Sequence, residues 1–414
     1  MLTSLHHLID LDWMFEAWTL TRKDGAAGID GRTAADYERD LEVNLESLLS
    51  RIKSGSYRAP PVRRHYIPKA DGLKRPLGIP TIEDKVAQRA ILMLLEPIYE
   101  QDFLDCSFGF RPDRSAHDAL RRLCDGIMGQ RQYWVIDADI SKYFDSIDHR
   151  HLRSFLDLRI TDGVIRRMID KWLKAGVLEG GTRQHSVAGT PQGGVLSPLL
   201  ANIFLHHVLD EWFVGVARPR LSGRSQLVRY ADDFVMTLED PESGKRMLGV
   251  LGRRLAKYGL MLHVGKTHYV DFRPHRLKGQ QHPVTDATTF NFLGFTHVWG
   301  RSRKGNRVVR QVTAKDRYAR SLKAIWNWCK TYRHLPLKRQ HEHLVRVMRG
   351  HYAYYGITGN AKRLNWYHYQ VRRIWKRWLG SRSQKDALTW SRMQGLLKRY
   401  PLPPAKIVRQ WRSP

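Results

Sequence analysis

The sequence predicts an α+β protein with more than one hydrophobic core. The chain has 414 residues, more than one core usually supports, and 42% of them are apolar, enough to fill two or three packed subdomains. In the first 300 residues, segments with apolar residues at helical spacing alternate with short runs of strand-forming residues. From residue 301 onward the helical spacing dominates. We therefore expect sheets and helices in the front part and helices alone in the last quarter.

The front part is expected to alternate helices and strands in a defined order. Thr33 caps a helix over residues 33–53, and Asp71-Gly72 is the turn of a hairpin between residues 63 and 80. A glycine-rich loop opens a long helix at Ser197 and Pro198, which are typical of a cap and a first turn. The other expected helices cover residues 82–99, 115–124 and 242–258, with one more near residue 151; the other expected strands cover residues 133–140, 260–272 and 290–295.

Three helices are expected in the last quarter of the chain. The first begins at Thr313, which with Asp316 is a weak capping box, and Pro336 separates it from a second helix over residues 337–355. The third covers residues 361–379. Its apolar residues fall on one stripe, and its basic residues fall on the other side: Arg372, Arg373, Lys376 and Arg377. This pattern predicts a small helical bundle with a basic outer face.

The charge of the chain is concentrated at its end. The net charge is +30; residues 301–414 hold 29 Lys and Arg against 3 Asp and Glu, whereas the first 300 residues hold 41 against 37. Seven of the 13 Trp also lie in residues 301–414. A nearly neutral front part followed by a basic, aromatic-rich tail favours a catalytic body joined to a module that binds a polyanion. The alternative is a basic face that only keeps the protein soluble.

Composition also excludes several classes of protein. Cys106, Cys124 and Cys329 are widely spaced, so they form neither a disulfide framework nor a four-cysteine zinc site. The 19 His show no spacing typical of zinc ligands and are assigned no metal. The apolar runs are too short to span a bilayer, and the N-terminus carries acids where a signal peptide carries bases. We expect a soluble protein of the bacterial cytoplasm, with no membrane partner and no zinc.

Two adjacent aspartates in an apolar run indicate the chemistry. Asp232 and Asp233 lie within "LVRYADDFVM", and a hairpin turn would let both side chains face the same way. Asp137 and Asp139 end the strand expected at residues 133–140. Carboxylates are the ligands that Mg²⁺ prefers, and two such ions about 3.5 to 4 Å apart are the usual device for joining or cutting phosphodiesters. Together with the basic tail, these carboxylates predict a metal-dependent enzyme that acts on nucleic acid.

Six motifs in order resemble the reverse transcriptases of bacterial group II introns. "DISKYFD", "GTPQGGVLSPLLANIFL" and "YADD" resemble the palm motifs of that family, and "GIDG", "IPKADGLKRPLGIPT" and "FGFRPDRSAHDAL" resemble its fingers. "FNFLGF" resembles the last palm element, and "GHYAYYGITGN" resembles the maturase, or thumb, domain. The resemblance implies a right-hand polymerase fold. Its segments would be fingers with an N-terminal extension (1–130), a palm with some interleaved fingers segments (131–300) and an all-helical thumb or maturase domain with a short basic tail (301–414).

The resemblance also assigns roles to particular residues. It places the metal ligands and catalytic carboxylates at Asp139, Asp232 and Asp233, which would hold two Mg²⁺ ions, with Mn²⁺ able to substitute. Asp137 remains a rival for Asp139, while Asp145 and Asp148 are expected to be local caps. The residues expected to bind the incoming dNTP are Lys69 and Arg75 at the triphosphate, Phe144 as a gate against the ribose 2′-hydroxyl, Gln192 beside the sugar and Lys266 near the pyrophosphate. Lys74 is the rival for the triphosphate, and Lys266 has the alternative of an ordinary surface lysine.

Other residues are expected to contact nucleic acid. Arg111 and the segment "GAAGIDG" would touch the template backbone, or else stabilise turns of the fold, and the sequence leaves both alternatives open. The basic side of the third helix of the tail would bind RNA or DNA. Gly193 and Gly194 would let the backbone of the glycine-rich loop approach its neighbours closely.

The expected function is RNA-directed DNA synthesis. The partners would be an RNA template, a primer, dNTPs, target DNA and the parent intron RNA, whose folding, splicing and retromobility the protein would assist as a ribonucleoprotein. Many members of the family end in a Cys-rich endonuclease that this sequence does not show, so the compact endonuclease-less type is expected. Three alternatives remain: a free-standing host reverse transcriptase in DNA repair or phage defence, a splicing factor without catalysis, and an RNA-copying RNA polymerase, which Phe144 disfavours.

Overall fold

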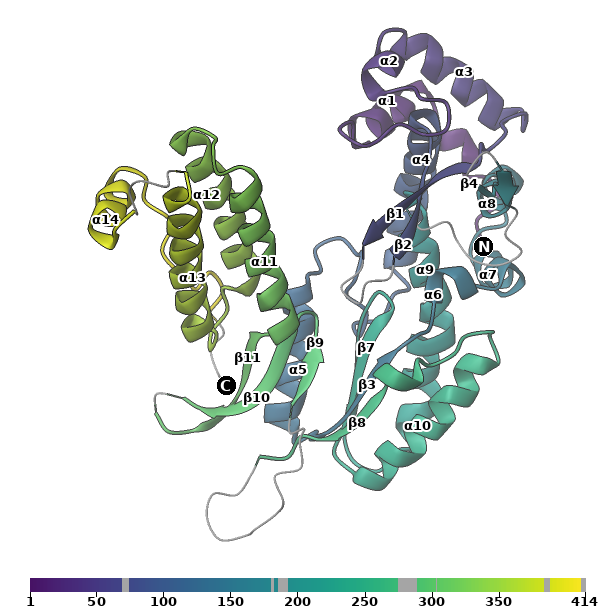
Figure 1. Cartoon of the computed structure of the whole chain (residues 1–414). Coiled ribbons are helices and arrows are strands. Elements are labelled where there is room, and N and C mark those ends of the chain that lie inside the picture. The colour runs from purple at the N-terminus through teal and green to yellow at the C-terminus, as the bar shows by residue number, and fades with distance from the viewer. Residues whose placement is uncertain are drawn as a thin grey trace. The chain divides into compact units, whose positions relative to one another are not determined.

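The chain folds into two compact units of α+β structure. The computed structural model describes residues 1–68, 74–179, 182–184, 193–274, 289–302, 304–382 and 388–410, with the backbone alone at residues 75, 179 and 182–184. The first unit contains Met1–Ala119 and Ala138–Tyr269, and the second contains Leu120–Asp137 and Val270–Pro414. Sheets in both units precede helices at the C-terminal end, as the sequence predicts (Figure 1).

Helices make up most of the N-terminal part of the first unit. Thr33 is an N-cap with a full capping box: its hydroxyl accepts from the amide of Asp36, and the Asp36 carboxylate accepts from the amide of Thr33. The helix expected over residues 33–53 is interrupted at Asp40, whose backbone is not helical. The elements are η1 (His6–Leu8), α1 (Leu11–Thr19), α2 (Ala34–Glu38), α3 (Leu41–Lys53) and α4 (Ile82–Glu100).

A four-stranded sheet with the order β2-β1-β4-β5 follows these helices. Strands β1 (Val62–Pro68) and β2 (Lys74–Ile79) form the expected antiparallel hairpin, with Pro68 opposite Lys74. The turn predicted at Asp71-Gly72 lies outside the described residues. Strands β4 (Val177–Glu179) and β5 (Thr182–Gln184) complete the sheet, and β4 runs parallel to β1.

A second sheet has the order β6-β7-β3-β8 and carries the aspartates of interest. Its strands are β3 (Trp134–Asp139), β6 (Ser225–Tyr230), β7 (Asp233–Leu238) and β8 (His268–Asp271); β3 and β8 each cross the border between the units. Strands β6 and β7 are antiparallel, and ten of their twelve residues are buried, which anchors the hairpin. The helical segments of this region are α6 (Tyr143–Ser146), α7 (His149–Asp157), α8 (Gly163–Lys174), α9 (Ser197–Leu205), η2 (His206–Asp210), η3 (Phe213–Ala217), η4 (Arg218–Arg220), α10 (Pro241–Ala256) and η5 (Val264–Lys266).

The second unit has a three-stranded sheet and a helical bundle. Strands β9 (Phe290–Phe292), β10 (Phe295–Arg301) and β11 (Arg307–Thr313) are antiparallel, so residues 307–313, expected to belong to a helical domain, form a strand instead. Helices α11 (Lys315–Thr331), α12 (Leu337–Tyr355) and α13 (Ala361–Gly380) lie side by side in Figure 1 and share one hydrophobic core. The unit also contains most of α5 (Ala116–Gln130) and the helix α14 (Trp390–Arg399), which the sequence did not predict.

Two helix starts differ from their sequence predictions. Thr313 does not cap α11, because it ends β11, where the side chain of Asn360 accepts from its amide at 3.1 Å and donates to its hydroxyl at 2.8 Å. The N-cap of α11 is Ala314. Ser197 is the first residue of α9 rather than its cap, which is Leu196. Both shifts are of one residue.

Two further expectations concern cysteines and membranes. Cys106, Cys124 and Cys329 are all free thiols, and burial raises the pKa of each. In the part of the chain that the structure describes, no helix has the length and apolarity needed to cross a bilayer.

Candidate active site

The two adjacent aspartates lie at the tip of the β6–β7 hairpin. Tyr230 pairs with Asp233, so Ala231 and Asp232 form a two-residue turn. Ala231 has φ +58°, a left-handed conformation that is uncommon for a residue with a Cβ. The turn, rather than a continuous strand, therefore carries Asp232, and Asp233 opens β7, as the sequence predicts.

Asp139 is the last residue of β3, the strand that neighbours β7 in the sheet. Its carbonyl oxygen accepts from the amide of His263 at 2.8 Å, which fixes the strand end. Its carboxylate oxygen Oδ2 accepts from the ammonium of Lys266 at 2.9 Å, in a pair whose side chains are 30% and 60% exposed. The structure thus brings together two residues that the sequence assigned to the same site.

Asp232 also lies near the segment that follows Asp139. Tyr143 on α6 is buried, and this burial raises the pKa of its phenol well above the ordinary value; the positive charge of Arg229 opposes the shift, and the negative charge of Asp232 adds to it. The hydroxyl of Tyr143 donates to the carbonyl oxygen of Ala201 at 2.5 Å. The Asp232 carboxylate is therefore close enough to α6 to act on it electrostatically.

These carboxylates fit a divalent cation by their chemistry. They are half-buried oxygen donors on neighbouring strands, and an ammonium group already lies against Asp139. Among the described residues, however, the group of three acidic, His or Cys side chains whose ligand atoms all lie within 4.8 Å of one another is His206, His207 and Glu211, not the three aspartates.

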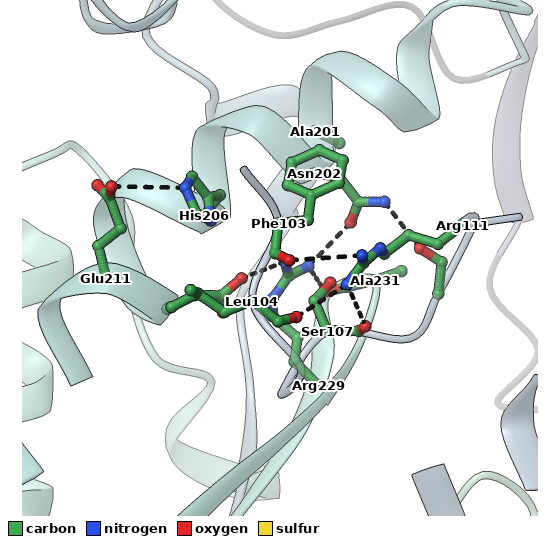
Figure 2. Close-up of polar contacts among 12 residues, drawn as sticks. Phe103, Leu104, Ser107, Arg111, Ala201, Asn202, His206, Glu211, Arg229 and Ala231 are labelled. Carbon is green, nitrogen blue, oxygen red and sulfur yellow. Dashed lines mark hydrogen bonds and ion pairs between the residues drawn. The ribbon is translucent and has the colours of Figure 1, made fainter. Parts of the chain in front are cut away.

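A fully buried arginine forms a hydrogen bond with the turn. Arg229 on β6 has no exposed side-chain surface, and neither has its ion-pair partner Asp210. Its guanidinium donates to both carboxylate oxygens of Asp210 at 2.8 and 2.5 Å. It also donates to Oδ1 of Asn202 at 2.9 Å and to the carbonyl oxygen of Ala231 at 3.0 Å, two residues that Figure 2 labels beside Arg229. Arg229 is not among the residues predicted from the sequence, where its one signal is a single base inside an otherwise apolar strand.

The segment before Arg111 lies directly against the turn. The amide of Phe108 donates to the carbonyl oxygen of Arg229, and the amide of Arg229 donates to the carbonyl oxygen of Cys106. A Cβ at Gly109 would meet the amide nitrogen of Ala231 at 2.4 Å, so only glycine fits. The side-chain amide of Asn202 donates to the carbonyl oxygen of Gly109 at 2.7 Å. The neighbouring Phe110 has φ +56° and is 55% exposed, an uncommon conformation for an aromatic residue.

Arg111 has a structural role. Its side chain is 3% exposed, and its guanidinium donates to both carboxylate oxygens of Glu100 and to the carbonyl oxygens of Leu104 and Ser107 (Figure 2). This arrangement does not support the expected template contact and matches the alternative of fold stabilisation. Gly28 of "GAAGIDG" is likewise packed, because a Cβ there would meet the backbone of Thr81 at 2.6 Å.

The residues expected around the dNTP are described only in part. Lys69 and Gln192 lie outside the described residues, and for Arg75 the backbone places it on β2 opposite Ile67. The close approach expected at Gly193 is confirmed: it has φ +112°, and a Cβ would lie 2.4 Å from the carbonyl oxygen of Gly78. The glycine-rich loop therefore contacts the strand that carries Arg75.

The remaining residues near Asp139 occupy the expected elements. Phe144 on α6 is half-buried, with its ring edge-on to Tyr143 at 5.3 Å. Asp148 is confirmed as a cap, since its carboxylate accepts from the amides of Arg150 and His151 at the start of α7. Asp145 is exposed on α6, and Asp137 is half-buried within β3.

The basic residues of α13 divide into two kinds. Arg373 and Arg377 are exposed, whereas Arg372 and Lys376 are half-buried. The Arg373 guanidinium lies 5.7 Å from the ring centre of Tyr369, and the Lys376 ammonium lies 5.2 Å from that of Trp390. The expected apolar stripe of this helix is confirmed, with Leu364, Tyr367, Val371, Ile374 and Trp375 all buried.

Two histidines and a glutamate form a second polar group in the first unit. His207 Nδ1 lies 2.6 Å from one carboxylate oxygen of Glu211, and His206 Nε2 lies 3.5 Å from the other. His207 and Glu211 are four residues apart, a spacing that places two side chains on one face of a helix. Burial lowers the pKa of His206, so it is a neutral donor or acceptor at neutral pH.

Comparison with known proteins assigns the family. The family model described as "Reverse transcriptase (RNA-dependent DNA polymerase)" matches residues 67–297, more than half of the chain. The chain belongs to the reverse transcriptase family. It is an RNA-dependent DNA polymerase, and this part of the sequence prediction is confirmed. The α+β class with helices at the C-terminal end agrees with it.

Individual relatives cover different shares of this reverse transcriptase. "Protein YkfC" of Escherichia coli (strain K12) is 35% identical over 358 residues, which are 76% of this chain and 88% of that protein. "Group II intron-encoded protein LtrA" of Lactococcus lactis subsp. cremoris is 46% identical over 168 residues, which are 40% of this chain and 28% of that protein. Among solved structures, telomerase from Candida albicans matches with a TM-score of 0.48 and 12% identity, over 88% of this chain and 65% of that one.

Proposed function

We propose that this reverse transcriptase extends a primer on an RNA template at a site formed by Asp139, Asp232 and Asp233. The observation that carries the proposal is the two-residue turn that presents Asp232 and Asp233 beside the strand ending in Asp139. Two Mg²⁺ ions, or Mn²⁺ in their place, would supply activation of the primer 3′-hydroxyl and stabilisation of the leaving oxygen when bound.

The other residues of the site would bind and orient the nucleotide. Lys266 lies within hydrogen-bond distance of Asp139, which supports a role close to the reacting phosphates. Arg75 would bind the triphosphate from β2, where Gly193 brings the glycine-rich loop against the same strand. Phe144, which lies on α6 five residues after Asp139, would exclude a ribose 2′-hydroxyl by its bulk. Lys69 and Gln192 are proposed on sequence resemblance alone.

RNA or DNA would be held in part by the basic helix α13. The exposed guanidinium groups of Arg373 and Arg377 are suited to phosphate contacts, and such contacts would weaken as salt rises. Arg372 and Lys376 would support them from half-buried positions. The proposed partners are template RNA, primer, target DNA and dNTPs. The proposed location is the bacterial cytoplasm, which the bacterial relative "Protein YkfC" supports.

For the biological setting, we propose a free-standing reverse transcriptase of DNA repair or phage defence as the first candidate. It is supported by the match to "Protein YkfC", which is 35% identical and extends over 76% of this chain and 88% of that protein. The second candidate is a maturase that binds group II intron RNA and promotes its splicing and retromobility. It is supported by the 46% identity to an intron-encoded protein over 168 residues.

Primer extension tests the catalytic proposal. The purified protein is given an RNA template, a DNA primer, dNTPs and Mg²⁺, and Asp232→Asn and Asp139→Asn are expected to abolish extension, while Asp233→Asn leaves residual activity. Equal residual activity of Asp232→Asn and Asp233→Asn would contradict the ranking of ligands. The setting is tested by adding the RNA that flanks the gene: accelerated splicing of that RNA would favour the maturase over the free-standing enzyme.

A further inference from the structure

We propose that Arg229 is a positioning residue of the catalytic turn, acting through the carbonyl group of Ala231. This inference rests on the proposed ligand role of Asp232. Arg229 precedes Asp232 by three residues, and its Nη1 donates to the carbonyl oxygen of Ala231 at 3.0 Å. That carbonyl belongs to the same peptide group as the amide nitrogen of Asp232. Because the peptide group is planar, a hydrogen bond that holds the carbonyl oxygen also fixes the orientation of this group, and with it the direction of the Asp232 side chain.

The turn needs such a constraint because its backbone is strained. Ala231 has φ +58°, which glycine adopts freely but which costs energy for a residue with a Cβ. A left-handed residue at this position persists only when its surroundings hold it. Gly109 closes one side, since no Cβ would fit between it and the amide of Ala231, and Arg229 holds the carbonyl of the same residue.

The guanidinium group is itself held in one orientation. Asp210 binds Nε and Nη2 through its two oxygens, and Asn202 accepts from Nη1 through Oδ1. The amide group of Asn202 cannot flip, because its Nδ2 donates to the carbonyl oxygen of Gly109. Three segments distant in sequence, residues 109, 202–210 and 229–231, thus determine where the planar fork of Arg229 points (Figure 2).

Stability alone does not require a charged pair here. A buried ion pair is often replaceable by apolar residues of similar volume without loss of stability, whereas removal of one partner leaves an uncompensated buried charge. An apolar pair, however, has no donor for the carbonyl of Ala231. Replacing both charges therefore separates the two roles of Arg229: stability can be restored, but the hydrogen bond to the turn cannot.

The closing experiment uses the full-length protein. The double variant Arg229→Met with Asp210→Leu is compared with the wild type, with Arg229→Lys, with Asp232→Asn and with Leu45→Ala, a buried residue of α3 that serves as a matched stability control. The measurements are urea unfolding, the single-turnover rate of nucleotide addition at saturating dNTP, the Kd for primer–template and Mn²⁺ binding followed by electron paramagnetic resonance.

We expect the double variant to unfold at a urea concentration no lower than that of Leu45→Ala but to add nucleotides about 10²-fold more slowly, the effect of a misplacement near 1 Å. Its Kd for primer–template should change less than about 2-fold, because no residue that touches nucleic acid is altered, and its Mn²⁺ affinity should fall. Arg229→Lys keeps a charge opposite Asp210 without the fork, and it should fold and be similarly slow. If the double variant does not fold, the rate of Arg229→Lys tests the positioning role instead.

A wild-type rate in a folded double variant or in Arg229→Lys would overturn the positioning role. Loss of rate without loss of Mn²⁺ affinity would also overturn it, since the turn would then hold its ligands correctly. The Asp232→Asn variant distinguishes failure of the positioning role from failure of the proposed function. If Asp232→Asn adds nucleotides normally, the proposed site is wrong. If Asp232→Asn is inactive while the double variant is active, the positioning inference alone fails.

Discussion

The close approach of Gly193 to Gly78 gives a prediction whose size follows from the structure. A Cβ at Gly193 would lie 2.4 Å from the Gly78 carbonyl oxygen, whereas ordinary contacts begin at 3.4 Å. Gly193→Ala must therefore move the glycine-rich loop and β2 apart by about 1 Å, which in an active site can cost about 10²-fold in rate. Because β2 carries Arg75, we expect kcat/KM for dNTP to fall by roughly this factor, mainly through KM.

Steady-state primer extension at varied dNTP concentration measures this effect. Gly55→Ala is the matched control, because Gly55 also has a left-handed φ, +77°, but a Cβ there meets nothing within 4 Å. Gly359→Ala is a second control with φ +94° and only ordinary contacts of 3.5 Å or more. Both controls carry the backbone strain without the collision. A dNTP KM for Gly193→Ala within 2-fold of the Gly55→Ala value would refute the reasoning.

Three further outcomes are expected. Burial raises the pKa of Asp84 to about 6, although three side chains donate to its carboxylate, so its contribution to stability is full below the unfolded pKa near 4 and is lost as pH rises through about 6. The free energy of unfolding of the wild type in urea, relative to that of Asp84→Asn, should therefore rise by about 1 kcal/mol as the pH is lowered from 7 to 5. Parallel pH profiles of the two proteins would contradict this. Lys266→Met removes the cation that lies against Asp139, and such an exposed ion pair is worth about 0.2 to 1 kcal/mol. The Mg²⁺ concentration for half-maximal extension should therefore fall by about 1.5- to 5-fold, while KM for dNTP rises. An unchanged Mg²⁺ requirement would show that Lys266 does not compete with the ion. Phe144→Val should raise the ratio of rNTP to dNTP incorporation by about 10-fold or more, in competition assays on one template, and an unchanged ratio would make Phe144 an ordinary packing residue.

Long periodic segments of this chain could be predicted closely from the sequence. Helix α12 begins at Leu337 and ends at Tyr355 as its pattern predicts, and α4 and α13 differ by a single residue at their ends. Apolar spacing over five turns leaves little choice of structure. Strand β11 was missed because it lies in a basic stretch whose strand character depends on pairing with β10, a contact that local sequence does not reveal.

In the candidate site, too, some features could be predicted from the sequence and others could not. The acidic turn and the strand end could be predicted because carboxylates beside apolar runs are unusual enough to be noticed. The cluster around Arg229 could not, because its partners, Asn202 and Asp210, are 27 and 19 residues away and belong to a helix that looks merely apolar. The sequence leaves the role of Arg111 open between template contact and fold stabilisation, because it does not show that the carboxylate of Glu100 lies beside this base in the fold.

The dependence of the turn on three distant segments has a consequence for how the chain acquires its activity. Gly109 packs against the left-handed Ala231, and Arg229, held by Asn202, donates to its carbonyl oxygen. A partly folded molecule, or a nascent chain that has just emerged with residues 225–238, would therefore have a relaxed hairpin with its aspartates misdirected. We expect DNA synthesis to begin only after this part of the protein has docked completely, so that folding itself acts as a checkpoint against premature copying.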